Sequence, residues 1–517
     1  MPRALPASLL LVLLPGPFLL PGPARAQDGD PPSPPDADPE APVPAADGDD
    51  DLDAITLEMS ALVEKFRGIP FTAPVARRWK DRESVREEFR PESPAKEERE
   101  GHREMNAGTR TLAFFGLVKE EGDAVEEAAR FQADAVGGYY SPREKVFTLV
   151  RGDGGSLNRM IVFHELVHAL EDQHFDFRAT ERGYRKNDLA DHFAAYRALV
   201  EGSAQRSTDR YLDSEEGLRK RVFRQIIVRD TGRDPFARKE KGEEGPGGEN
   251  PAPRPRPKGK PPTDFSKTPP YLILRNQMFP YHNGALFLEA VLAAPGEGSE
   301  VERLAALYRD PPVSSEQILH PEKYLGARDL PRELVLPDVL PLLGEGWEAT
   351  DTDTMGELGI GIALNRFLYG PNTMIQLSAV LRPPEGGFTK PEDLMNTPLI
   401  FRGTSGKAST GWDGDRYRIF AKGKATAAVW VSVWDTPEDA LEFAAAYGKI
   451  LGKKYRGVAP GEDEVWRGTR DGDTALEVSG DRVFLAERIP PDRLSPVLKA
   501  LHGAEVRRDP RDAIPAR

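Results

Sequence analysis

The chain has 517 residues, a formal net charge of −14 at pH 7 and no cysteine. This length leaves room for two or three domains, and the absence of cysteine excludes thiolate catalysis, disulfide bonds and zinc sites with Cys ligands. Residues 27–53 contain ten Asp and Glu and no Lys or Arg, so this segment carries most of the net charge. The remainder mixes both signs and shows no basic stripe that would predict a nucleic-acid partner.

Residues 1–26 are typical of a secretory signal peptide. Arg3 gives a positive start, Leu5–Leu20 is mostly apolar, and Ala24-Arg25-Ala26 fits the small-x-small cleavage rule. We therefore expect export to the periplasm or the extracellular space, with a mature chain that begins near Gln27. No later stretch is long and apolar enough to span a bilayer, so no membrane span is expected.

The remaining chain divides by composition into a linker and two folded parts. Residues 27–51 are rich in Pro, Asp and Ala and are expected to be disordered. A mostly helical domain is expected over 52–345, with a flexible insertion at 231–267 that is rich in Pro, Gly and charged residues. Residues 346–507 predict a small α+β domain, and 508–517 a tail. The predicted fold class of the whole chain is therefore α+β.

Within the helical domain, residues 136–150 change character. Two β-rich runs flank a Ser-Pro-Arg-Glu turn, which predicts a hairpin. Its strand either lines a cleft and pairs with a substrate backbone by β-augmentation, or it only covers the next helix. Residues 178–187 are expected to form a polar loop, and a helix is expected from about Asp188 to Leu212.

The C-terminal part shows shorter alternating segments. Arg416–Ala421 and Thr426–Trp434 predict strands. Thr436 is followed by Pro and two acidic residues, which is typical of a helix start. Three short β runs and a last helix near 490–502 complete the expected domain.

The most informative motif is His164-Glu165-Leu166-Val167-His168. On a helix, a spacing of four places both imidazoles on one face, one turn apart, as two ligands of one zinc ion require. Glu165 stands beside them, where it can act as the general base for a metal-activated water. We therefore predict His164 and His168 as metal ligands and Glu165 as a catalytic residue.

A catalytic zinc site usually has three protein ligands, and three residues compete for the third place. His174 follows His168 at the metzincin spacing, but Glu171 stands where that pattern has a turn-forming glycine. If the helix continues, His174 points about 120° away from His168. His192 is a weaker candidate. Glu201 lies on the next helix among small residues, where a buried carboxylate is favourable only if it meets a cation, so we predict Glu201 as the third ligand of one Zn²⁺.

Three runs carry a resemblance to a known group: His164–Phe175, Ala198–Gly202 and Asp310–Tyr324. They resemble a group of predicted, exported bacterial gluzincin-like metallopeptidases. The resemblance covers the expected helical domain and implies a zincin-like fold with a His-His-Glu zinc site. The chain departs from the group's pattern at Glu171, where Gln is more typical, and at Ser203, where Asp is more typical.

The expected activity is zinc-dependent hydrolysis of peptide bonds in a peptide or protein substrate. Glu165 would take a proton from the attacking water and pass it to the leaving amine. The developing oxyanion needs a second donor, for which Tyr281, His282, His320 and Tyr324 are candidates and Tyr281 and His320 are preferred. Two alternatives stay open: a non-catalytic zinc-binding exported protein on the same scaffold, and a zinc amidase that acts on cell-wall material.

Overall fold

The computed structural model describes residues 51–89, 110–118, 133, 136–151, 155–215, 218–222, 225, 271, 274–370 and 400–507. The expected signal peptide (1–26), nearly all of the linker (27–51), the insertion (231–267) and the whole tail (508–517) lie outside these residues.

A helical unit comes first along the chain. Its elements are α1 (Leu52–Arg67), β1 (Ala76–Lys80), α2 (Arg82–Phe89), β2 (Gly138–Ser141), β3 (Val146–Val150), α5 (Gly155–Phe175), α6 (Phe177–Lys186), α7 (Ala190–Asp213), the π-helix η2 (Leu274–Asn283), α10 (Gly284–Ala293), α11 (Glu300–Arg309), α12 (Ser315–Leu319) and the 3₁₀-helix η3 (Pro321–Lys323).

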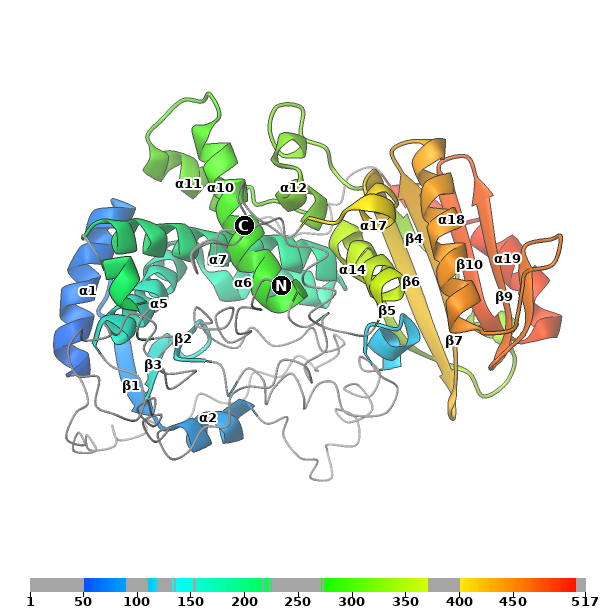
Figure 1. Cartoon of the computed structure of the whole chain (residues 1–517), viewed down its shortest axis with the longest axis horizontal. Helices are drawn as coiled ribbons and strands as arrows, with labels where there is room; N and C mark the ends of the chain where they lie inside the picture. Colours follow the sequence, from blue (N-terminus) through cyan, green and yellow to red (C-terminus); the bar gives the residue numbers. More distant parts are fainter. Residues whose placement is uncertain are drawn as a thin grey trace, which may run out of the picture.

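A sheet unit follows. Its elements are β4 (Glu333–Val335), α13 (Leu340–Leu343), β5 (Glu348–Asp353), α14 (Gly356–Tyr369), α17 (Gly403–Lys407), β6 (Trp412–Lys422), β7 (Ala425–Trp434), α18 (Pro437–Lys454), β8 (Val465–Thr469), β9 (Gly472–Ser479), β10 (Arg482–Ile489), the 3₁₀-helix η4 (Pro491–Arg493), α19 (Leu494–Leu501) and β11 (Glu505–Arg507). Figure 1 shows the two units beside each other. The predicted α+β fold class is confirmed.

The six-stranded sheet has the order β5-β6-β7-β10-β9-β8, and all neighbouring strands are antiparallel. Alternate residues of β7 enter two cores, because successive side chains point to opposite faces. Trp430 and Trp434 pack against α18, whereas Val429 and Val431 pack with α19 on the other face. The first of these cores also contains α7 residues such as Leu199, so the two units share one hydrophobic core.

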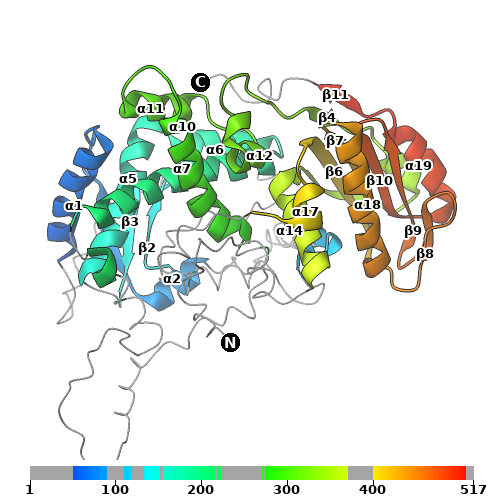
Figure 2. The ribbon, with the colours of Figure 1, turned by 45° about the horizontal axis from the view of Figure 1, so that its top comes forward.

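The sheet unit uses chain from ahead of residue 345, where the boundary between the two domains was expected. β4 pairs antiparallel with β11 near the C-terminal end of the chain (Figure 2). Leu334 and Leu343 are buried in the core between the sheet and α19. The linking segment is therefore part of the second unit's packing.

The expected hairpin is present as β2 and β3, paired antiparallel. β1 pairs parallel with β3 on the other side, which leaves β2 at the edge of a three-stranded sheet. The segment expected to be a polar loop, 178–187, instead forms α6. The prediction was wrong because Phe177 and Tyr184, two helical turns apart, are both buried against α7 residues such as Tyr196.

Helices α7 and α10 cross at van der Waals contact of their backbones. A Cβ atom on Gly202 would lie 2.3 Å from the carbonyl carbon of Gly284, and one on Gly284 would lie 2.0 Å from the carbonyl oxygen of Ala198. Gly202 and Ala198, the small residues beside Glu201, therefore allow this close helix crossing.

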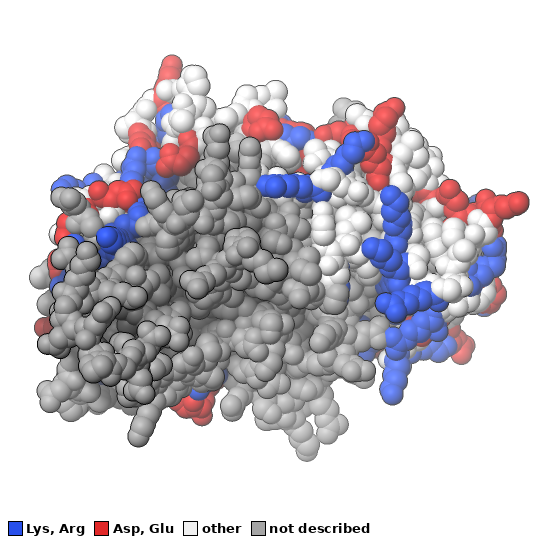
Figure 3. Space-filling view, in the orientation of Figure 1, with Lys and Arg blue, Asp and Glu red and all other residues white. Residues whose placement is uncertain are grey.

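None of the helices in the described part of the chain combines the length and the apolar character that a bilayer crossing requires. On the face shown in Figure 3, acidic and basic side chains of the described residues both lie at the surface, and Lys and Arg gather over the sheet unit.

We predict that Gly202→Ala destabilises the protein by about 1–3 kcal/mol, because the two helices would have to separate. Equilibrium urea unfolding measures this change. The matched control is Gly452→Ala in α18, where a Cβ meets no atom within 4 Å. That substitution should leave the stability unchanged or raise it by up to about 1 kcal/mol. Equal effects of the two substitutions would contradict the close crossing.

Candidate metal centre

The predicted metal ligands come together between α5 and α7. His164, His168 and Glu201 each offer a ligand atom, and these atoms lie within 4.8 Å of one another. Nε2 of His168 is 3.1 Å from Oε2 of Glu201, and Nε2 of His164 is 3.7 Å from the same oxygen. All three residues are buried. The structure therefore groups the two histidines of the motif with the predicted carboxylate from the second helix.

The spacing of these atoms fits a small tetrahedral ion. Nitrogen and oxygen ligands of zinc lie about 2.0–2.2 Å from the metal, so two ligands of a tetrahedron are about 3.4 Å apart. The two separations that involve Glu201, 3.1 Å and 3.7 Å, lie on either side of that value, and all three ligand atoms lie within 4.8 Å of one another. Two imidazoles and one carboxylate also form a donor set that zinc accepts.

The hydrogen bonds of His164 select the tautomer that a metal needs. Thr208 donates its hydroxyl proton to the carbonyl oxygen of Ala204 at 2.8 Å. Its oxygen must then accept from Nδ1 of His164, 3.1 Å away, which places the ring proton on Nδ1. Nε2 keeps its lone pair, and this buried nitrogen has no hydrogen-bond partner among the described residues. Metal-ligating histidines are commonly oriented in this way by a second hydrogen bond.

The charges of the three residues are strongly coupled. Burial lowers the pKa of His164 to about 4. Burial also acts to lower the pKa of His168, but the charge of Glu201 and its hydrogen bond outweigh this effect and raise that pKa to about 9. Burial acts to raise the pKa of Glu201, but the charge of His168 and the hydrogen bonds of both histidines together outweigh this effect and hold that pKa below its usual range. Metal binding must therefore release the proton of His168.

Glu165 is held by a backbone group of the edge strand. Its Oε2 accepts the N–H of Tyr140 in β2 at 2.8 Å. Its Oε1 is buried and has no hydrogen-bond partner among the described residues. Burial raises the pKa of this carboxyl well above its usual value. One oxygen is thus fixed by the protein, and the other remains available to a reacting group.

Of the two residues preferred as oxyanion donors, only Tyr281 is in contact with this group. It lies on η2, its ring centroid is 6.0 Å from that of His164, and its phenol hydrogen-bonds to Glu201. His320 instead places Nε2 3.0 Å from Oε1 of Glu357 on α14, and none of its described contacts involves a metal-group residue. The hydroxyl of Tyr324 donates to a loop carbonyl.

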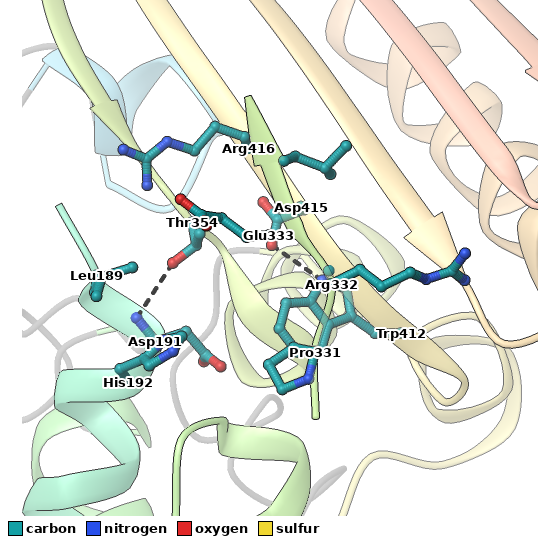
Figure 4. A pocket seen from close by; sticks show the side chains of 12 residues that line it. Leu189, Asp191, His192, Pro331, Arg332, Glu333, Thr354, Trp412, Asp415 and Arg416 are labelled. Carbon is teal, nitrogen blue, oxygen red and sulfur yellow. Dashed lines mark hydrogen bonds between the residues drawn. The ribbon is translucent and has the colours of Figure 1, made fainter. Parts of the chain in front are cut away.

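The two rejected ligand candidates also have other surroundings. His174 is exposed, and its Nε2 lies 2.9 Å from the carbonyl oxygen of Pro70. His192 is 5% exposed and has no hydrogen-bond partner on either ring nitrogen among the described residues. It lines a cavity of about 30 Å³ between α7 and the sheet unit (Figure 4). The helix that continues through Glu171 turns His174 away from the metal group, as predicted.

Two side chains at the site were missed by the sequence reasoning. Arg197 places Nη2 3.9 Å from Oε1 of Glu201, and Thr208 orients His164. They stand four residues before and seven residues after Glu201, so all three share one face of α7. This helical spacing from Glu201 was the sequence signal that could have identified Arg197 and Thr208.

A second buried cluster connects the ligand helices. Glu171 on α5 accepts hydrogen bonds from Arg67 of α1, Ser203 of α7 and Tyr308 of α11, at 2.5–2.6 Å. Glu171 and Ser203 are the two positions at which the sequence analysis noted Gln and Asp as the more typical residues. They contact each other, so the two departures form one hydrogen bond between α5 and α7.

Residues 342–498 match a family model described as "Domain of unknown function (DUF8575)". This match begins in α13 and ends in α19, so it covers most of the sheet unit and leaves the metal group outside. No curated protein and no solved structure matches the chain.

We predict that Glu201→Ala abolishes stoichiometric zinc binding, because it removes one of three ligands, whereas His174→Ala retains about one equivalent. Metal content after dialysis, measured by atomic absorption, tests both variants. Loss of zinc from His174→Ala together with retention in Glu201→Ala would overturn the ligand assignment.

A second prediction concerns pH. Burial, and then the charges of Arg416 and Arg328, lower the pKa of His192 to about 3. In the unfolded chain this residue binds a proton below about pH 6.5, so the folded state loses stability as the pH falls through that value. Relative to His192→Leu, wild type should lose about 2 kcal/mol of unfolding free energy between pH 7 and pH 5.

Asp191 acts in the opposite direction, because burial raises the pKa of its carboxyl to about 7, but it is present in both proteins and cancels in the comparison. Urea unfolding at several pH values measures the difference. Parallel stability curves for the two proteins would contradict a buried, neutral His192.

Proposed function

We propose that the protein is an exported zinc-dependent metallopeptidase that hydrolyses peptide bonds. The observation that carries this proposal is the position of Glu165. It adjoins a buried group of two histidines and one glutamate, and one of its carboxylate oxygens has no hydrogen-bond partner among the described residues. A site with a purely structural metal has no use for such a carboxylate.

The proposed roles follow from these contacts. His164, His168 and Glu201 would hold the ion, which supplies Lewis-acid chemistry for the activation of water. Oε1 of Glu165 accepts a proton from the attacking water, and the carboxyl then donates that proton to the leaving amine nitrogen. The Tyr140 N–H keeps the other oxygen in place during both transfers.

Tyr281 is the proposed second donor to the oxyanion. Burial raises the pKa of its phenol well above its ordinary value, so the group stays protonated and can donate a hydrogen bond. His320 is left out of the proposed mechanism, because it pairs with Glu357 on α14 and none of its described contacts involves Glu165 or the three predicted ligands.

The edge strand supports a peptide as the substrate class. In β2, Tyr140 is opposite Phe147. Gly137, three residues earlier, accepts the ladder bond from the N–H of Val150. In an antiparallel pair such bonds alternate, so the N–H and C=O of Tyr140 point away from β3. The N–H donates to Glu165, and the carbonyl lies on the same side of β2, where no strand of the described residues pairs with it. An extended peptide can pair with such an edge independently of its sequence.

We predict that Glu165→Gln lowers the rate of hydrolysis of unfolded casein by at least about a thousandfold, because the proton acceptor is lost. The amide is nearly isosteric and can still accept the Tyr140 N–H, so zinc content should stay at one equivalent. If wild type and variant were equally inert while each bound one zinc, the protein would be a binding module. If wild type released products from cell-wall material and left casein intact, it would be an amidase.

A further inference from the structure

The helix that carries Glu201 has no side-chain cap of its own. The first N–H groups of any α-helix lack partners within the helix and need other acceptors. Leu189 occupies the N-cap position of α7, and it provides no capping hydrogen bond. Acceptors for the start of α7 must therefore come from elsewhere in the chain.

The sheet unit provides these acceptors. Oδ1 of Asp353, the last residue of β5, accepts the N–H of Ala190 at 2.8 Å. Oγ1 of Thr354 accepts the N–H of Asp191 at 3.3 Å, as the dashed line in Figure 4 shows. The negative charge of Asp353 also lies at the positive end of the helix dipole. The start of α7 is thus capped by residues that lie more than 160 positions later in the chain.

The capping segment is fixed to the sheet. Asp353 is paired with Tyr417 of β6. Asp415, also on β6, accepts the backbone N–H groups of Met355 and Gly356 at 2.9–3.1 Å, and the indole N–H of Trp412 at 3.0 Å. Figure 4 shows Asp415 and Trp412 close to Thr354. The acceptors at the helix start are therefore held by the core of the sheet unit.

Contacts on the helix side complete the junction. Arg416 of β6 donates to the carbonyl oxygen of Asp188 at 2.7 Å. Oδ2 of Asp191 accepts the N–H of Ser315 at 2.9 Å. Gly356 has a φ of +67°, and a Cβ on it would lie 1.8 Å from Oδ1 of Asp191. The backbone at Gly356 therefore packs directly against the Asp191 side chain, and a larger residue at position 356 would not fit.

We propose that Asp353 is a positioning residue for the metal centre and that the sheet unit acts as an intramolecular cap on the ligand helix. Glu201 lies three turns from Ala190 on the same uninterrupted helix. A change at the capped end therefore shifts or loosens the carboxylate that completes the metal group. This inference rests on the proposed function and deepens it, because it gives a role to the part of the chain that matches the domain of unknown function.

The test compares three variants of the full-length protein. Asp353→Ala removes the cap, and Asp353→Asn keeps an oxygen acceptor at the same place. The matched control is Thr436→Ala, which removes the capping box of α18 in the same unit, away from α7. Zinc affinity is measured by competition with a chromophoric chelator, and amide hydrogen exchange is followed over residues 190–196.

Asp353→Ala should raise the zinc Kd about three- to tenfold and increase exchange at the start of α7. Asp353→Asn should restore most of both properties, and Thr436→Ala should leave the zinc Kd unchanged while it lowers Tm. A zinc Kd that is unchanged in Asp353→Ala, or is raised as much in Thr436→Ala, would overturn the positioning role. A wild-type protein that bound no zinc would overturn the proposed function, and this inference with it.

Discussion

The buried carboxylate of Glu171 is the constraint on which the metal centre depends. An unpaired charge in this core would cost several kcal/mol, so the carboxylate must keep its donors, and they come from α1, α7 and α11. Those bonds hold α5 against α7 one turn beyond His168. They also require the helix to remain intact through position 171, which excludes a turn that would bring His174 back to the metal group. Glu201 of α7 then completes the group of three side chains that could hold a metal ion.

Helix α7 packs against neighbouring elements on nearly all of its sides, since almost every one of its residues is buried. One face presents Arg197, Glu201 and Thr208 to α5. Gly202 brings a second face into backbone contact with α10, the helix that continues from the π-helical segment with Tyr281. The helix start is enclosed by the sheet unit. The position of the Glu201 carboxylate is therefore set by contacts on several sides of α7. Because both units of the chain provide these contacts, the two units cannot be considered separately.

The sequence allowed the local elements to be predicted where a short-range rule decides them. The hairpin before α5, the start of α18 at Thr436 and the grouping of two histidines one turn apart all follow from spacing and turn chemistry. Glu201 could be predicted because a carboxylate among small residues is unfavourable without a cation. The failures concern long-range packing. α6 forms because Tyr184 is buried against Tyr196 of α7. His320 pairs with Glu357 of α14, which lies 37 residues later in the chain. The hydrophobic periodicity of a segment does not indicate which helix or strand, distant in the sequence, it will pack against.

Burial of Glu165 has a consequence for the order of events at the site. Burial favours the neutral carboxyl and raises its pKa well above the usual value, so the ionised form that accepts a proton is disfavoured when no cation lies beside it. A divalent cation beside it favours the ionised form. Burial disfavours the ionised carboxylate of Glu165 when no cation is present. It also strengthens the attraction between this carboxylate and a nearby cation, because the local dielectric constant is low. The Tyr140 N–H stabilises the ionised form as well. Under the proposed mechanism, the buried position of Glu165 therefore links the ionisation of its carboxyl to the presence of a cation in the group of His164, His168 and Glu201.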